Sequence, residues 1–445
     1  MRTAIYLILF IFISYSEILA QRSNKSAVEK LSKSVFEETT LTGLKFRSIG
    51  PAQTSGRVSD FAINPNNFKE YYVAAASGGV WKTVNAGTTY IPVFDEAGSY
   101  SIGCITMDPN NANVIWVGTG ENNNQRSVPY GDGVYKSIDG GETWKNMGLK
   151  SSEHIGKILV DPNNSNIIYV AAIGPLWSSG GERGVYKSVN GGETWRLMLG
   201  IDADTGINDL IMDPRDSQVI YAAAYQRRRH VFTYLGGGPS SGLHKSVDGG
   251  TTWVDINKGL PEVDMGRIGM AMAPSDPEVI YAIVEASEGK GGFFMSTNRG
   301  ASWKKQGNYS TSGNYYQEIV VDPQDAQTVY AMNTWIQVSR DGGKTFKVLG
   351  ETTKHVDNHC MWIDPTDSEH FLVGCDGGIY ESWDRAETWH YKPNLPVTQF
   401  YKVALDNAYP FYHVYGGTQD NASLGGPSRS LSDNGISNEE WINTH

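Results

Sequence analysis

Short apolar runs separated by polar turns recur along most of the chain. In the best-preserved unit, ILV (158–160), IIYVAA (167–172), GVYKS (184–188) and TWRLM (194–198) follow one another with turn residues between them. Runs of this length, rich in Val, Ile and Tyr and bounded by Gly, Pro, Asn and Asp, are typical of β-strands. None shows the helical period of about 3.6 residues. The pattern therefore predicts repeated units of four short strands.

Nearly the same phrase joins the third and fourth strands of each unit. KSIDGGETW spans residues 136–144, and related phrases stand at 187–195, 245–253, 296–303 and 339–346. Looser copies at 82–90 and 381–389 make seven. The closing aromatic residue returns every 43 to 58 residues, roughly the spacing of a repeat architecture. We predict an all-β fold over residues 44–445, a β-propeller of four-stranded antiparallel blades with seven or eight repeats.

The residues of this phrase suit a tight turn. The Asp or Asn side chain can fold back to accept backbone N–H groups, the glycines can take positive φ, and the Trp can bury its ring between neighbouring sheets. We expect this structural role for Asp139, Trp144, Asn190, Trp195, Asp248, Trp253 and Asp341.

The phrase S-x-D-x-G-x-T-W resembles the Asp-box, also called the bacterial neuraminidase repeat. Through it, roughly residues 44–445 resemble the propellers of sialidases, of two-propeller xyloglucanases and of the sortilin N-terminal domain. The resemblance implies a propeller fold. Because the Asp-box is structural wherever it occurs, the function has to be argued from other residues.

The two ends of the chain differ from the repeats. Residues 1–20, MRTAIYLILFIFISYSEILA, predict a secretory signal peptide, and residues 21–43 a flexible leader, so we expect a protein that is secreted or held in the cell envelope. No later apolar run is long enough to span a bilayer. Residues 44–51 resemble an unpaired fourth strand that could complete the last blade. The final repeat is degenerate, and we interpret the chain as part of a longer parent.

Charge and cysteine content exclude some classes of function. A net charge of −11 argues against a nucleic-acid partner, and the basic run at 226–230 is interpreted as a solvated loop. Three cysteines do not make a disulfide framework. Cys360 and Cys375 could pair across a hairpin, although two buried free thiols are the favoured interpretation.

Loops between the second and third strands are long in repeats two to four and short in repeats one, six and seven. They would form a lopsided groove across one face of the ring, suited to an extended glycan or peptide. Asp209 stands among the polar residues expected near this mouth. The candidate ligand-binding residues there are Arg57, Arg126, His154, Arg267, His355, His359 and Gln419.

Residues 355–359 read His-Val-Asp-Asn-His. In an extended strand, His355, Asp357 and His359 would share one face and could hold a divalent metal near Asp376. A hydrogen-bonded polar rim is the favoured interpretation, so no cofactor is predicted.

Two functions fit these observations. The favoured one is a sortilin-like binding module for a peptide or glycan, because no catalytic constellation stands out. The alternative is a xyloglucanase-like glycoside hydrolase, which needs an acid and a base carboxylate on either side of the scissile bond. A sialidase is disfavoured because FRSIGP, with Arg47, matches the Phe/Tyr-Arg-Ile-Pro motif only in part. The candidate catalytic carboxylates are Asp357, Asp376, Asp420 and Glu121.

Overall fold

The computed structural model describes residues 46–125 and 128–444. The predicted signal peptide, the leader and Arg126 lie outside the described residues. The chain divides into two compact units, Met1–Ile49 and Gly50–His445, and the fold below is that of the second. No helix among the described residues has the length and apolar character needed to cross a membrane.

Among the described residues, eight four-stranded antiparallel sheets are formed, each from consecutive stretches of chain, together with one two-stranded hairpin. The first four sheets are β1 (Val58–Ile63), β2 (Tyr71–Ala75), β3 (Gly79–Thr83) and β4 (Ile91–Pro92); β5 (Ile102–Asp108), β6 (Asn111–Thr119), β7 (Val134–Ser137) and β8 (Lys145–Gly148); β9 (Ile155–Asp161), β10 (Asn164–Ala172), β11 (Gly184–Ser188) and β12 (Arg196–Leu199); and β13 (Thr205–Asp213), β14 (Asp216–Gln226), β17 (Gly242–Ser246) and β18 (Val254–Asp255).

The other four sheets are β19 (Met265–Met272), β20 (Ile280–Ala286), β21 (Gly292–Ser296) and β22 (Lys304–Gly307); β23 (Ile319–Val321), β24 (Val329–Ala331), β25 (Gln337–Ser339) and β26 (Lys347–Val348); β27 (Asn358–Asp364), β28 (Asp367–Cys375), β29 (Gly378–Ser382) and β30 (His390–Tyr391); and β31 (Ala404–Leu405), β32 (His413–Gly417), β33 (Ser423–Pro427) and β34 (Ile442–Asn443). The hairpin pairs β15 (Arg228–Arg229) with β16 (Tyr234–Leu235), and short 3₁₀ turns occupy Lys150–Ser152, Ser287–Gly289 and Asn438–Glu440.

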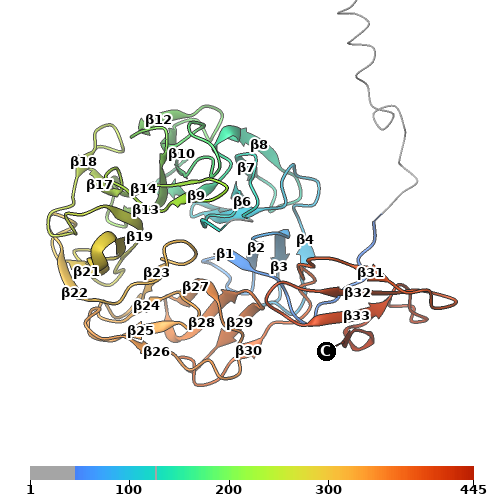
Figure 1. Ribbon diagram of the computed structural model, residues 1–445. Coiled ribbons are helices and arrows are strands. Elements are labelled where there is room, and N and C mark those ends of the chain that lie inside the picture. Colours follow the sequence, from blue (N-terminus) through green and yellow to red (C-terminus); the bar gives the residue numbers. More distant parts are fainter. Residues whose placement is uncertain (1–45, 126–127, 445) are drawn as a thin grey trace, which may run out of the picture. The chain divides into compact units, whose positions relative to one another are not determined.

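Seven of the sheets form a closed ring, which confirms the predicted all-β propeller (Figure 1). The first strand of each sheet is innermost: β1 packs on β5, β5 on β9, β9 on β13, β13 on β19 and β19 on β23. The ring closes where β1 packs against β27 and β28. Residues 46–51 form no strand, contrary to the prediction of a strand for the last blade, because β30 already occupies that position.

The eighth sheet, β31–β34, lies beside the ring rather than within it (Figure 1). The loop after β32 reaches back to the ring, where the Asn421 side-chain amide donates to the Asp376 carbonyl at 3.1 Å. This contact brings residues 418–421 to the same face as the ends of β6 and β28.

The repeated phrase forms the turn between the third and fourth strands, as predicted. In the β7–β8 turn, the Ser137 hydroxyl donates to Asp139 Oδ1 at 2.7 Å and accepts the Gly141 amide at 2.8 Å. The Thr143 amide donates to Asp139 Oδ1 at 2.9 Å, and Gly140 and Gly141 have φ of 70° and 92°. The turn is therefore closed by the aspartate side chain and favours glycine at its tip, although Arg385 and Ala386 take the same positive φ in the copy at 381–389.

The same bonds recur in other turns. Asp248 and Asp341 accept the amide four residues ahead at 2.8 and 2.9 Å, and Asn190 does so at 3.0 Å. Hydroxyl and amide donors hold the pKa of Asp139 and Asp248 at about 2, and the pKa of Asp341 is also about 2.

The tryptophan that follows the turn links neighbouring sheets. Trp144 Nε1 donates to the Val93 carbonyl at 2.5 Å and Trp195 Nε1 to the Met147 carbonyl at 2.7 Å, both in the preceding sheet. Trp253 instead bonds within its own turn, although its ring is still half-buried against a core shared by two sheets. Each ring thus contributes apolar packing between blades.

The cysteines are free and buried. Cys360 lies opposite Gly374, and Asn358 opposite Cys375, so the two thiols are not a directly facing pair.

Candidate functional site

A cluster of charged side chains lies where the first and seventh sheets meet. Arg57 immediately precedes β1, Glu121 follows β6 and Asp376 follows β28. Arg57 donates to Asp376 from Nε at 2.8 Å and from Nη2 at 3.1 Å, and to Glu121 from Nη1 at 2.7 Å. Its guanidinium carbon lies 4.8 Å from the centre of the Tyr315 ring. All three guanidinium nitrogens thus donate to two carboxylates that are at most 4% exposed.

Asp376 is surrounded by hydrogen-bond donors. His359 Nε2 lies 2.7 Å from Oδ1, and the Tyr315 hydroxyl donates to Oδ2 at 2.9 Å. Burial alone would raise the pKa of Asp376, but His359 and Arg57 outweigh burial and hold that pKa well below its usual range. Asp376 is therefore a fixed negative charge that neither gives up a proton nor has a free oxygen for attack.

An open pocket of about 320 Å³ adjoins this cluster, and we call it the outer pocket. Asp420, in the loop after β32, lies on its rim with a side chain 46% exposed, and Asp420 Oδ2 is 4.0 Å from Arg57 Nη2. Partial burial, and then the neighbouring charge of Asp376, raise the pKa of Asp420. A raised pKa in a solvent-facing carboxyl group is the direction that general acid catalysis requires. The outer pocket is lined by Arg57, Glu121, Asp357, Asp376, Gln419 and Asp420, among others.

Asp357 is a second carboxylate of the outer pocket. The Tyr316 hydroxyl donates to its Oδ1, its amide donates to the Thr334 carbonyl at 2.8 Å, and its carbonyl accepts the Asp376 amide at 3.1 Å. Asp357 has φ of 62° and Asp420 has φ of 55°. Left-handed backbone at non-glycine residues carries strain, and such residues cluster at functional sites.

The positive φ of Asp357 means that residues 355–359 are not extended, so the prediction of three side chains on one face is wrong. His355 Nε2 lies 2.9 Å from the Asp420 carbonyl and Nδ1 lies 2.7 Å from the Val356 carbonyl, whereas His359 faces Asp376. Within the described ranges, no three His, Cys, Asp or Glu side chains converge as a metal site.

His355 fastens the Asp420 loop to the ring. Burial lowers the pKa of His355, but the Cys375 side chain and the carbonyls of Asp420 and Val356 outweigh burial and raise this pKa to about 9. Only a protonated imidazole can donate to both carbonyls at once. His355 is therefore a cation that positions Asp420 at neutral pH.

The other predicted ligand-binding residues are dispersed. Gln419 lines the outer pocket and donates to Asp420 Oδ2 at 3.2 Å. His154 is 1% exposed, and its Nδ1 lies 2.8 Å from the Glu121 carbonyl. Burial and the charge of Arg227 lower the pKa of His154 well below its usual value, so it is a neutral support for the Glu121 loop.

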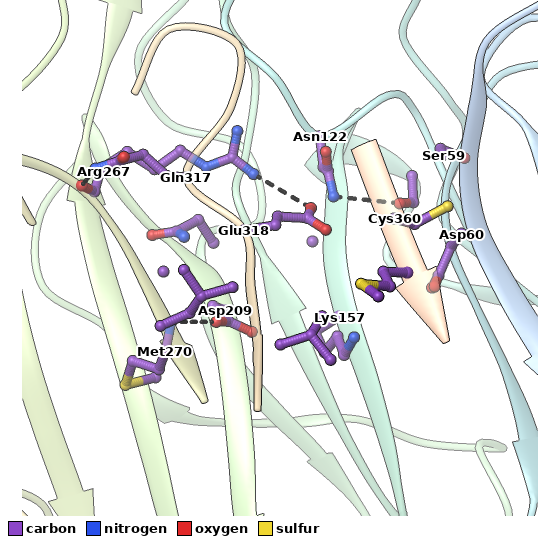
Figure 2. Close-up of a pocket in the computed structure, with 17 residues that line it drawn as sticks. Ser59, Asp60, Asn122, Lys157, Asp209, Arg267, Met270, Gln317, Glu318 and Cys360 are labelled. Carbon is purple, nitrogen blue, oxygen red and sulfur yellow. Dashed lines mark hydrogen bonds and ion pairs between the residues drawn. The ribbon is translucent and has the colours of Figure 1, made fainter. Parts of the chain in front are cut away.

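Arg267 and Asp209 lie elsewhere, in a cavity on the axis of the ring that we call the axial cavity (Figure 2). Both side chains come from inner strands, β19 and β13, which explains why they face the axis rather than the outer pocket.

The basic run at 226–230 is not a solvated loop, contrary to the prediction. Arg227 is completely buried and donates to the carbonyls of Asn123 at 2.7 Å and Gly174 at 3.2 Å. Arg229 Nε donates to the Asn124 carbonyl at 2.7 Å. These arginines hold the loop that follows Glu121, and burial lowers the pKa of Arg227 to about 9.

Sequence reasoning missed the two tyrosines of the cluster. Tyr315 and Tyr316 lie in the connection from β22 to β23, and they donate to Asp376 and Asp357. The available signal was a pair of adjacent tyrosines in a long loop on the face that carries the other polar residues.

The fold and this site define the chain as a seven-bladed β-propeller with an acidic pocket on one loop face. No protein-family model matches the chain. It is 26% identical over 326 residues to the xyloglucanase of Hypocrea jecorina, covering 66% of this chain and 35% of that protein. It is 24% identical over 319 residues to a xyloglucanase of Acetivibrio thermocellus, covering 63% of this chain and 36% of that protein. The chain thus spans about a third of these curated relatives.

Solved structures agree on the fold. The GH74 xyloglucanase from Xanthomonas campestris superposes with a TM-score of 0.61 at 16% identity, covering 84% of this chain and 59% of that one. A GH74 enzyme of Niastella koreensis gives a TM-score of 0.59 at 18% identity, covering 84% of this chain and 60% of that one. At these identities the likeness establishes the architecture only.

Proposed function

We propose that the protein is a glycoside hydrolase that cleaves a xyloglucan-type polysaccharide at the outer pocket. The observation that carries the proposal is Asp420, a partly exposed carboxyl group with a raised pKa beside the permanently ionised Asp376. Similarity to xyloglucanases supports the substrate class. These comparisons favour the hydrolase alternative over the binding module that the sequence alone favoured.

The two catalytic roles divide between the carboxylates that Arg57 does not hold in a hydrogen bond. Asp420 donates a proton to the glycosidic oxygen. Asp357, which lines the same pocket and is positioned by Tyr316, acts from the other side of the bond as base or nucleophile. Asp376 and Glu121 are the ion-pair partners of Arg57. Asp376, whose pKa is held low, contributes negative charge beside the sugar ring, on which positive charge develops in the transition state.

Exposed aromatic side chains on the loops are consistent with binding of an extended glycan. Tyr130 is 72% exposed, Trp177 48% and Phe232 94%, and they lie in the long second-to-third-strand connections of the second, third and fourth sheets. Tyr401, 69% exposed, lines the outer pocket itself. Aromatic rings of this kind bury apolar area against the flat faces of sugars.

We also propose that the enzyme acts outside the cytoplasm, because residues 1–20 have the features of a signal peptide. N-terminal sequencing of protein from the medium or envelope should give a chain that starts near Gln21. A chain there that keeps Met1 would refute export by this signal.

The direct test is release of reducing ends from xyloglucan and a panel of other β-glucans. The wild-type chain should release them, and Asp420→Asn and Asp357→Asn should each lower the rate by about 100-fold or more, as expected when a general acid or base is lost. Asp433→Asn is the matched control, because Asp433 is exposed and lies outside the pocket. Absence of release by folded wild-type protein, or full activity of both pocket variants, would overturn the proposal.

A further inference from the structure

The axial cavity has a volume of about 120 Å³ and no role in the proposed reaction. Figure 2 shows ionisable side chains from several inner strands meeting around it. Two of them are cations and three are carboxylic acids: Lys157, Arg267, Asp60, Asp209 and Glu318.

Two of the carboxyl groups already accept hydrogen bonds from backbone amides. Asp60 accepts the amide of the residue after it at 2.9 Å and the Ile105 amide of the neighbouring sheet at 3.0 Å. Asp209 repeats this arrangement, with the next amide at 2.9 Å and the Met270 amide at 3.0 Å. Asp60, together with the other cavity carboxyl groups, raises the pKa of Lys157, so the ammonium remains charged, while burial raises the pKa of Asp60, Asp209 and Glu318 themselves.

Arg267 and Asn208 each have a buried polar atom without a hydrogen-bond partner among the described residues. The Arg267 side chain is 4% exposed, its Nη2 lies 3.8 Å from Glu318 Oε1, and its Nε has no hydrogen-bond partner among the described residues. Asn208, 4% exposed, donates to the Ile268 carbonyl, but its Oδ1 also has no partner within the described chain. Buried polar groups are nearly always satisfied, so these atoms on the cavity wall point to a guest.

The size and charge of the axial cavity restrict that guest. Since one water occupies about 30 Å³, the volume suits roughly four waters or one small molecule. An anionic guest would lie beside three carboxyl groups, and a cationic guest would be repelled by Lys157 and Arg267. A hydroxyl group both donates and accepts, and the wall offers Arg267 as donor and Asn208 and Glu318 as acceptors. We propose that the axial cavity binds a small neutral polyol.

The axial cavity is separate from the outer pocket. A small pocket of about 10 Å³ lies between them, and it shares Ser59, Asn122 and Glu318 with the axial cavity but Arg57 and Tyr315 with the outer pocket. The axial cavity and the outer pocket have no lining residue in common. Polyol binding is therefore independent of the proposed hydrolysis, and Asp420→Asn should abolish activity and leave polyol binding intact.

The test is ligand-observed NMR titration of the full chain with erythritol. The matched control ligand is a butanediol, which has the same carbon chain length but lacks the two inner hydroxyl groups. Wild-type protein should bind erythritol saturably and the butanediol far more weakly. Arg267→Met and Glu318→Met should each weaken erythritol binding about ten-fold or more, the cost of a lost hydrogen bond to a charged group.

Arg196→Met, at an exposed position on β12 away from the cavity, should bind erythritol as the wild type does. Thermal unfolding checks that each variant is folded. If Arg267→Met does not fold, Glu318→Met decides the question. Absence of saturable binding by the wild type, equal binding of the two ligands, or unchanged affinity in the folded cavity variants would each overturn the proposal.

Discussion

Arg57 binds both carboxylate oxygens of Asp376, at 2.8 and 3.1 Å, although the two residues are 319 positions apart in the chain. The pair lies where the first sheet meets the seventh, so one ion pair both helps to close the ring and fixes the charge of the candidate site. Stability and the proposed chemistry are consequently coupled at this position.

Replacing Arg57 by Met should destabilise the ring. Asp376 and Glu121 would remain buried without their cation, and breaking a buried ion pair from one side costs about 3–5 kcal/mol. Urea denaturation should show a correspondingly lower free energy of unfolding. Lys145→Met is the control, because the Lys145–Glu193 pair is 64% and 61% exposed and should matter much less. Equal effects of the two substitutions would contradict the assigned role of Arg57.

Asp420 should titrate above the ordinary aspartate pKa of about 3.9. Carbon-detected NMR of its carboxyl group measures this without any assay of activity. Because the negative charge of Asp376 contributes to the raised pKa, Asp376→Asn should move the Asp420 titration to lower pH. In an active enzyme, the alkaline limb of the pH–rate profile should move the same way. Titration of Asp420 at or below 3.9 in the wild type would remove it as the acid.

His355 should make stability depend on pH on the alkaline side. Its folded-state pKa of about 9 lies above the unfolded value of about 6.5, so its contribution is complete below about 6.5 and is lost as the pH rises through 9. The wild type should lose stability over this range relative to His355→Gln. His230→Gln, at an exposed position, should keep the wild-type decline. A decline of the same size in His355→Gln would show that another group is responsible.

The turn aspartates should make the protein sensitive to acid. Asp139, Asp248 and Asp341 have depressed pKa values of about 2, so their contribution is present above the unfolded value of about 3.9 and is lost as the pH falls towards 2. Replacing all three by Asn should keep the fold, because Asn190 already makes the equivalent turn. The triple variant should lose less stability than the wild type between pH 4 and 2 in thermal unfolding, and an identical acid profile would contradict this.

The architecture could be predicted because its signal is local and repeated. The Ser137, Asp139 and Gly141 positions encode one closed turn, and the aromatic residue that follows marks the start of the next strand in every copy. Ring closure could not be predicted in the same way. Whether residues 46–51 or β30 supplies the last strand depends on contacts between sheets, and the local pattern carries no information about them.

The candidate site was predicted in part. Arg57, Glu121, Asp376 and Asp420 were expected on one face because each adjoins the end or beginning of a strand that reaches it. The separate roles of these residues could not be predicted from the sequence, because the pKa of Asp376 depends on hydrogen-bond partners such as Arg57 and Tyr315 that are distant in sequence. Arg227 and Arg229 were misinterpreted for the same reason, since their partners are backbone carbonyls of distant loops.

The ring consists of consecutive stretches of chain, and no strand is exchanged at the contact between β1 and β27. Under mechanical load applied at residues 58 and 391, this contact is the first to bear the force, because no strand pairing joins its two sides. The ring would then open into a row of sheets that each hold only their immediate neighbours, and these would detach in steps from the two ends.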